Sequence, residues 1–337
     1  MAVMSASASA SRVRAILSST WFRLTARSLV GVAVLVAVVA QVGSEPFLHG
    51  LASIDLPVIA IALALSAIAT IAAAWRWSVI AGRLGVGVRL RDAVGHYYRS
   101  QFLNTVLPGG VVGDVQRAVT QGRDAGNVAQ AARAVVIERT AGQVVQIALA
   151  VIVLAGFGLE FEGYLLPVLG IGLTVLALAV LTAAATSSRA RRALRRELGE
   201  LSAGLGSPGA FVRVVVASII VVGCHVATLG VAVAAVGASV PPFRLAALAL
   251  VILLAGSIPL NLGGWGPREG VAGWTFAVAG LGAATGVAAS ALFGVLAMIA
   301  VAPGLVLAVA SAAHRTRRTP APASAAVSEG VHERVGS

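Results

Sequence analysis

The chain has 337 residues, of which 58% are hydrophobic and only 11% are charged, and its mean hydropathy is +0.93. Soluble globular chains are about 45–50% apolar and about 25% charged, so this composition argues against a water-soluble enzyme and a disordered protein. The apolar residues form long runs, whereas the strands of an outer-membrane barrel alternate apolar with polar positions, which excludes a barrel. We therefore predict an all-α, polytopic integral membrane protein.

All 25 basic residues are arginine, and the formal net charge is +12. The arginines lie between the apolar runs without a nucleic-acid-binding motif, so we predict no nucleic-acid partner and relate the charge to membrane topology. The single cysteine, Cys224, excludes an intrachain disulfide and a cysteine-built metal site. His96 and His225 each lack a second histidine at ligand spacing, so we expect neither a metal site nor a cofactor.

Eight apolar runs predict about eight transmembrane helices. They lie at 29–42, 57–80, 139–158, 164–186, 212–237, 245–260, 270–285 and 287–311. A basic segment, 1–28, precedes the first run, and because no small-residue cleavage site follows that run, we expect a retained first helix. The membrane domain is expected to cover 29–311, and the tail 312–337, rich in Ala, Pro, Ser and Arg, to be a disordered cytoplasmic end.

Arginine is concentrated in alternate connecting segments, namely the segment before residue 29, 81–99, 187–200 and the tail after 311. On the other side, the segments 43–56 and 159–163 carry acidic residues, such as Glu45 and Glu160, the segment 237–242 carries no charge, and Arg244 is the exception. Because arginine-rich loops stay on the cytoplasmic side, both termini are predicted to be cytoplasmic.

A first break in the helical pattern contains Pro108, Gly109, Gly110 and Gly113. Proline disfavours helix at the residue before it, so 93–107 is expected to end as a half-helix and a new helix to begin near Asp114, which is placed to cap it. Arg117 follows on the same face. One interpretation is a cytoplasmic loop with a capped helix. The other is a re-entrant element that lines a polar cavity.

A second break, which contains Gly263, Gly264 and Gly266, separates the runs 245–260 and 270–285. Each run covers about 24 Å, less than a hydrocarbon core of about 30 Å. Arg268 and Glu269 follow, so this break has the same ingredients as the first. Short, glycine-interrupted segments in two halves are typical of a transporter's binding site. A chance recurrence of glycine-rich turns, and an interfacial loop with a snorkelling arginine, are the alternatives.

Three more polar positions are candidates. Glu138, beside Arg139 at the start of a predicted span, is expected either to bind an arginine of another segment, such as Arg76, Arg117 or Arg268, or to be solvated at the interface. Arg76 lies between two tryptophans, which favours an aromatic belt with a snorkelling arginine, although a lipid phosphate is an alternative partner. Asn104 belongs to a mixed aromatic and polar face that predicts docking at the headgroup level.

The order of these motifs resembles the transmembrane, flippase-like domain of lysylphosphatidylglycerol synthases. The strings L-P-G-G-x-x-G-D-x-x-R at 107–117 and P-x-N-x-G-G-x-G-x-x-E at 259–269 carry the resemblance, which covers about 25–311. It implies a stand-alone bacterial member without the synthase domain, multi-pass in the cytoplasmic (inner) membrane. The substrate-binding residues expected are Arg76, Asn104, Asp114, Arg117, Glu138, Arg139, Arg268 and Glu269, with hinges at Pro108, Gly109, Gly110, Gly113, Gly263, Gly264 and Gly266.

The resemblance implies a lipid translocase, because in its synthase relatives this domain is thought to move an aminoacylated phospholipid between leaflets. The expected partners are membrane lipids: an anionic or aminoacylated phospholipid, or a polyprenyl-linked glycolipid. The sequence contains no P-loop or nucleophile motif, so we expect no enzyme. Two alternatives stay open: a membrane-embedded transferase acting on lipid-linked substrates, and an accessory subunit of a glycosyltransferase. A homo-oligomer is a further expectation.

Overall fold

A computed structural model describes residues 36–107, 110–157, 170, 182, 185–257 and 265–309, and every regular element assigned within them is an α-helix. The basic segment 1–28, the tail 312–337 and most of the predicted span 164–186 lie outside the described residues. The same holds for the first half of the run 29–42, of which 36–42 is described, as helix. The all-helical membrane architecture is confirmed for the part that the structure describes.

Four helices are long and apolar enough to cross a membrane. They are α4 (Leu56–Arg83), α7 (Val128–Phe157), α10 (Pro208–Ala235) and the stretch Ala283–Val309, which begins with α13 (Ala283–Ala300). Only about a third of each spanning window is buried inside the protein. Large apolar side chains such as Ile71, Ile152 and Val216 are exposed on these helices, as expected for surfaces that face lipid.

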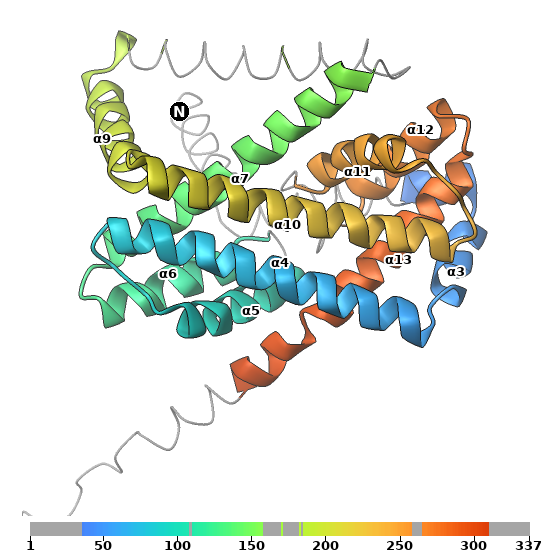
Figure 1. Cartoon of the computed structure of the whole chain (residues 1–337), viewed down its shortest axis with the longest axis horizontal. Helices are drawn as coiled ribbons and strands as arrows, with labels where there is room; N and C mark the ends of the chain where they lie inside the picture. Colours follow the sequence, from blue (N-terminus) through green and yellow to red (C-terminus); the bar gives the residue numbers. More distant parts are fainter. Residues whose placement is uncertain are drawn as a thin grey trace, which may run out of the picture.

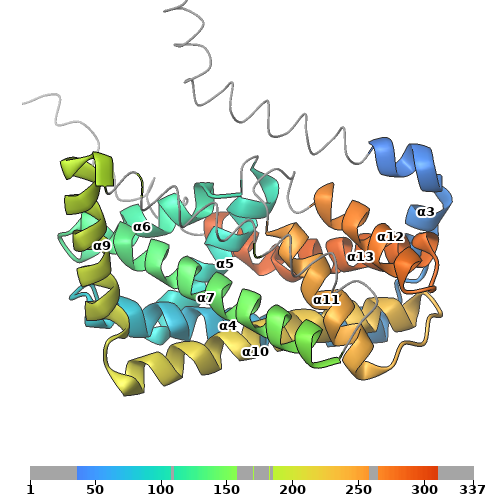
Figure 2. The same cartoon turned by 90° about the horizontal axis from the view of Figure 1, so that it is seen from above.

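The two ends of this bundle are marked by short helices (Figures 1 and 2). At one end α9 (Ser188–Leu205) runs across the direction of the long helices, and Arg83 Nε at the end of α4 donates to the carbonyl of Ala203, 3.1 Å away. At the other end α3 (Glu45–Ala52) packs on α13, where Gly50 lies against the backbone of Ala288. We call these the α9 end and the α3 end.

A first helical hairpin enters the bundle from the α9 end. It consists of α5 (Leu90–Val106) and α6 (Val112–Asp124). Gln121, near the end of α6, donates to the carbonyls of Val86 and Gly87, which precede α5. At the closed tip the N–H of Gly113 donates to Asn104 Oδ1 at 2.7 Å. The hairpin therefore opens at the α9 end and its tip points to the middle of the bundle (Figure 1).

A second hairpin enters from the α3 end. It consists of α11 (Pro242–Gly256) and α12 (Pro267–Val278). Arg244 Nη2 donates to the carbonyl of Ala279 at 2.7 Å and joins its open ends, while Gly256 packs on the side chain of Arg268 near its tip. Arg244, the exception to the charge pattern, thus caps the C-terminal end of α12. The helices have 15 and 12 residues, about 22 Å and about 18 Å, so neither crosses a bilayer alone.

The structure corrects two of the predictions made for the membrane spans. The predicted spans 245–260 and 270–285 are the two arms of one hairpin, and the count of eight spans stays a prediction beside the four long helices described. Helix α7 begins at Val128, eleven residues before the predicted start at 139. The reason is that Glu138 and Arg139 have partners inside the protein, so the helix continues through charges that the sequence pattern places at an interface.

Candidate functional site

A cavity of about 620 Å³ lies between the tips of the two hairpins. The first tip contributes Gly110, Val111 and Asp114, and the second contributes Gly256 and Ser257. Helices α4, α5, α7, α10 and α13 also contribute to its walls. An adjoining cavity of about 370 Å³ shares part of this lining, including Arg139, and adds Arg76 and Arg268. The two elements that the sequence singles out as breaks therefore meet at one internal space.

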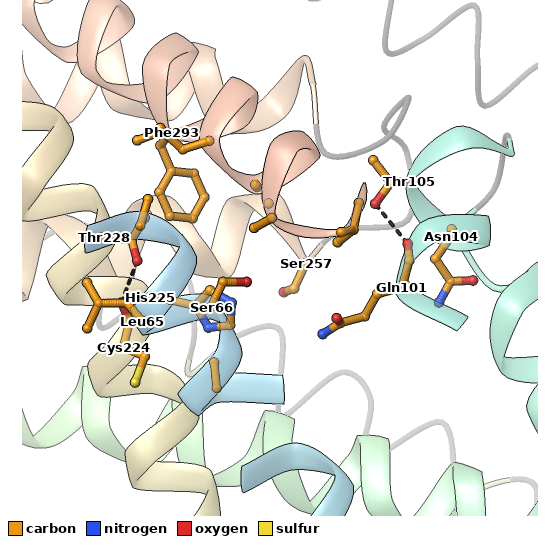
Figure 3. A pocket seen from close by; sticks show the side chains of 18 of the residues that line it. Leu65, Ser66, Gln101, Asn104, Thr105, Cys224, His225, Thr228, Ser257 and Phe293 are labelled. Carbon is orange, nitrogen blue, oxygen red and sulfur yellow. Dashed lines mark hydrogen bonds between the residues drawn. The ribbon is translucent and has the colours of Figure 1, made fainter. Parts of the chain in front are cut away.

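The cavity wall combines polar and apolar side chains (Figure 3). Gln101 and Asn104 come from α5, and Ser257 lies opposite them at the end of α11. Gln143 Nε2 donates to Ser257 Oγ at 3.3 Å, which connects α7 to the second hairpin. Phe293 adds an apolar surface. Such a wall suits a ligand with a polar head and an apolar chain.

Glu138 is the centre of a buried charge network and is fully inaccessible. Its Oε1 accepts from Arg76 Nε at 2.9 Å, in an ion pair that also engages Arg76 Nη2, and from the hydroxyl of Tyr97 at 3.1 Å. Its Oε2 accepts from Arg117 Nη2 at 3.0 Å. Arg76 Nη1 donates to Ser218 Oγ at 2.9 Å. One carboxylate therefore holds together α4, α5, α6 and α7, and through Arg76 also α10.

Arg117 is fully buried within this network. Its guanidinium lies over the rings of Trp77 and Tyr97, with Cζ at 4.6 and 4.4 Å from their centroids. Its Nε and Nη1 are buried without an acceptor among the described residues. The two rings therefore supply cation–π attraction where hydrogen-bond acceptors are lacking.

Asp114 lies between this network and the cavity. It accepts from Arg117 Nη2 at 3.1 Å, as expected for side chains three residues apart on a helix, and from Arg139 Nη2 at 2.9 Å. Ser100 and Asn104 of α5 donate to it as well. The expectation that Asp114 caps its helix is wrong. The N-cap residue of α6 is Val111, where no side-chain cap hydrogen bond forms, and the Asp114 carboxylate accepts from the four side chains named here.

The second pair, Arg268 with Glu269, makes its contacts around the start of α12 and with α13. Arg268 Nη2 donates to Glu269 Oε1 at 2.5 Å, and Ser290 of α13 bonds to both side chains. Glu269 Oε2 accepts from the N–H of Gly266 at 2.7 Å and so caps the start of α12. Gly266 has φ +111°, a conformation that glycine adopts without strain. Arg268 also lies over Trp265 and Phe293.

The predicted site residues divide into two groups. Asn104, Asp114, Arg76, Arg139 and Arg268 line the cavities. Arg117, Glu138 and Glu269 are fully buried behind them and are absent from the lining described. They position the lining residues.

Several sequence interpretations need correction. Arg76 does not snorkel, since its residue is only 6% exposed and Trp77 beside it is fully buried. Glu138 binds Arg76 and Arg117, whereas Arg268 pairs with Glu269. The interfacial loop with a snorkelling Arg268 is likewise wrong, because Arg268 is 5% exposed.

Of the expected hinges, three fall among the described residues. Gly110 has φ +61° at the first tip, and Gly266 precedes α12. Gly113 lets α6 touch the backbone of Ser100, where a Cβ would overlap. The remaining hinges, Pro108, Gly109, Gly263 and Gly264, lie outside the described residues.

Sequence reasoning missed residues that accommodate the arginines. Ser218 and Ser290 accept from Arg76 and Arg268. Gly142 of α7 and Gly294 of α13 each lie under one of these guanidiniums, where a Cβ would collide with it. A small residue in the middle of a long apolar helix is a weak signal, because this sequence contains 38 glycines.

His96, His225 and Cys224 lie in the part of the chain that the structure describes. Among the described residues, no group of three His, Cys, Asp or Glu side chains is placed to hold an ion. His96 packs edge-on against Trp77 and accepts from Arg99 Nη2 at 2.9 Å. Burial, together with the positive charge of Arg99, lowers the pKa of His96 below its ordinary value of 6.5. His225 and Cys224 line the cavity.

Long apolar helices, two opposed hairpins and a charged internal cavity define a polytopic membrane protein with a polar site inside the bundle. The chain belongs to the family of the lysylphosphatidylglycerol synthase transmembrane region, whose model matches residues 24–304. The suspected family is therefore confirmed, and it relates the protein to lipid handling. Comparisons with curated proteins and with solved structures gave no match.

Proposed function

We propose that the protein moves a lipid between the leaflets of the bacterial cytoplasmic membrane, with the headgroup passing through the cavity between the hairpin tips. The observation that carries this proposal is the placement of Arg76, Arg139 and Arg268 on the walls of two adjoining cavities reached by both hairpins. A headgroup that crosses the hydrocarbon core loses its hydration, at a cost of several kcal/mol or more if it is charged, unless polar groups replace the water.

Two further features support this function. The hairpins enter from opposite ends of the bundle, and residues at both tips line the same cavity. The lining is apolar as well as polar, with Leu65 and Phe293 available for the first carbons of acyl chains (Figure 3). The sequence contains no P-loop motif, so we propose that the lipid moves down its own concentration gradient or that its transport is coupled to the proton motive force.

Reconstituted liposomes test this proposal. Phosphatidylglycerol with a fluorescent acyl chain is incorporated, and a membrane-impermeant reductant quenches the label in the outer leaflet. We expect the protein to bring inner-leaflet lipid out to the reductant and Arg139→Gln to slow this at least about tenfold. The matched control is Arg213→Gln, an exposed arginine of α10 away from the cavity. Equal quenching with and without protein, across a panel of candidate lipids, would contradict the proposal.

The alternative, a membrane-embedded transferase, predicts a different result. An enzyme forms product in detergent, where leaflets no longer exist, whereas a translocase shows no measurable activity without a bilayer. Product formation from lipid-linked substrates by the purified protein would therefore replace the transport proposal.

A further inference from the structure

We propose that the ion pair between Asp114 and Arg139 is a latch that a phosphate group opens: the substrate's phosphate replaces the Asp114 carboxylate on the Arg139 guanidinium. The inference rests on the proposed function and names its substrate class, a lipid whose headgroup carries a phosphate. It assigns separate roles to residues that the sequence treats as one binding set.

The charge of the first network favours an anion. Its three arginines, Arg76, Arg117 and Arg139, face two carboxylates, Asp114 and Glu138, so one positive charge is unbalanced among the described residues. The Arg268 pair adds no excess, since Glu269 balances it. A net charge inside an apolar protein is unfavourable unless water or a counter-ion compensates it. A phosphate in the cavity supplies that compensation.

Arg139 is the arginine that offers free donors to the cavity. About half of its side-chain surface, 46%, is accessible, against 7% for Arg76 and 0% for Arg117. It lines both cavities. Only its Nη2 is engaged, by Asp114, so its Nε and Nη1 have no acceptor among the described residues. A planar guanidinium binds phosphate through two parallel hydrogen bonds, which this arrangement permits.

Asp114 can release Arg139 without losing all its partners. Its carboxylate also accepts from Arg117, Ser100 and Asn104, and these bonds do not depend on Arg139. It faces the cavity with 13% of its side chain accessible, whereas Glu138 is completely enclosed. Exchange at Asp114 therefore leaves no buried carboxylate without donors, while exchange at Glu138 would leave its enclosed carboxylate with the hydroxyl of Tyr97 as the remaining donor among the described residues.

Binding to the purified, full-length protein in a neutral detergent tests the latch apart from transport. Calorimetric titration uses three probes: dihexanoyl phosphatidylglycerol, inorganic phosphate, and dihexanoylglycerol, which lacks the phosphate. We expect the phospholipid to bind and the diglyceride not to bind. Arg139→Gln should weaken phospholipid binding at least about tenfold, and Asp114→Asn should strengthen it about threefold or more, because a competing internal anion is removed. Arg213→Gln is the control and should bind as the wild type does.

The outcomes separate the two proposals. If Arg139→Gln binds the phospholipid as well as the wild type, or folded Asp114→Asn binds it no better, the latch is contradicted even where the wild type transports lipid. If both variants behave as expected but liposomes show no transport, the latch stands and the proposed function fails. Tight binding of inorganic phosphate alone would support the exchange at Arg139 and point to a free anion in place of a lipid.

Discussion

The two hairpins use the same residue types in different ways. In the first, Asp114 and Arg117 of α6 belong to a network that joins α4, α5, α7 and α10. In the second, Arg268 and Glu269 are adjacent, and their further partners are the N-terminal backbone of their own helix and Ser290 of α13. The first pair is therefore shared across the bundle, whereas the second connects its own hairpin to one neighbouring helix, α13.

This difference has a physical consequence. A shared network couples the position of the first tip to the long helices, and removal of one member leaves several buried charges without partners. A local pair holds one helix start and one neighbour, so its loss is confined. We expect the first hairpin to carry the larger energetic effects and the second to move more independently.

The largest effect is expected for Glu138→Gln, which removes the counter-charge of Arg76 in the interior and leaves Arg117 with Asp114 as its remaining anionic partner. Breaking a buried pair in this way costs about 3–5 kcal/mol. Thermal unfolding in detergent measures the loss. Glu197→Gln, whose side chain is 55% exposed in a 4.0 Å pair with Arg133, is the control and should stay within about 0.5 kcal/mol of the wild type. Equal stability of the two variants would show that the network is not shared.

Glu269→Gln should have a smaller effect, about 1.5–3 kcal/mol, because one arginine loses its partner and the amide oxygen still accepts from Gly266. Arg268 also lines a cavity, where water can solvate it. The same unfolding assay compares it with Glu138→Gln. A loss as large as that of Glu138→Gln would remove the distinction between local and shared pairs.

Backbone packing gives a third comparison. Gly113→Ala places a methyl group against the backbone of Ser100 within the first hairpin. Gly286→Ala, on α13, places a methyl group against the backbone of Ala272 in the second hairpin. Overpacking of this kind costs about 1–3 kcal/mol. Gly95→Ala, with nothing within 4 Å of its added Cβ, should be neutral or slightly stabilising. Unchanged melting temperatures for both tight sites would contradict the close approach of these helices.

The smallest effect concerns pH. His96 on α5, outside the four long helices, has a lowered pKa in the folded protein, so the unfolded chain takes up a proton first as pH falls. Its contribution to stability is complete above its ordinary value of 6.5 and is lost below it. Between about pH 7.5 and about pH 5.5, His96→Gln should flatten the decline of the melting temperature. A decline that matches the wild type would show that His96 titrates freely.

Local rules predicted much of the first hairpin. The proline after Leu107 and the glycines around it placed the end of one half-helix, and α5 ends at Val106. The pairing of Asp114 with Arg117 follows from helical spacing alone. The two runs around the second break are too short to cross a bilayer but were still counted as spans, and the helices found there are the hairpin arms α11 and α12.

Long-range pairing was beyond the sequence. Glu138 lies 62 residues from Arg76, and three arginines were equally acceptable partners, because the pattern along a chain does not show which helices pack together. For the same reason, the sequence pattern predicted the start of α7 too far along the chain and assigned Trp77 to a membrane interface, although Trp77 is fully buried. Arg76 and Arg268, which the sequence pattern indicated as interfacial side chains, form buried ion pairs with Glu138 and Glu269.

The most direct test is whether the space between the hairpin tips holds water and a lipid headgroup. Ser257→Cys, on a Cys224→Ser background, places a thiol at the second tip, on the wall of both cavities. Val216→Cys, a lipid-facing position of α10 with 41% exposure, is the matched control. We predict that a membrane-impermeant thiol reagent modifies the cavity cysteine much faster than the control, and that dihexanoyl phosphatidylglycerol slows this reaction. Equal, slow labelling at both positions would contradict a hydrated passage for lipid headgroups.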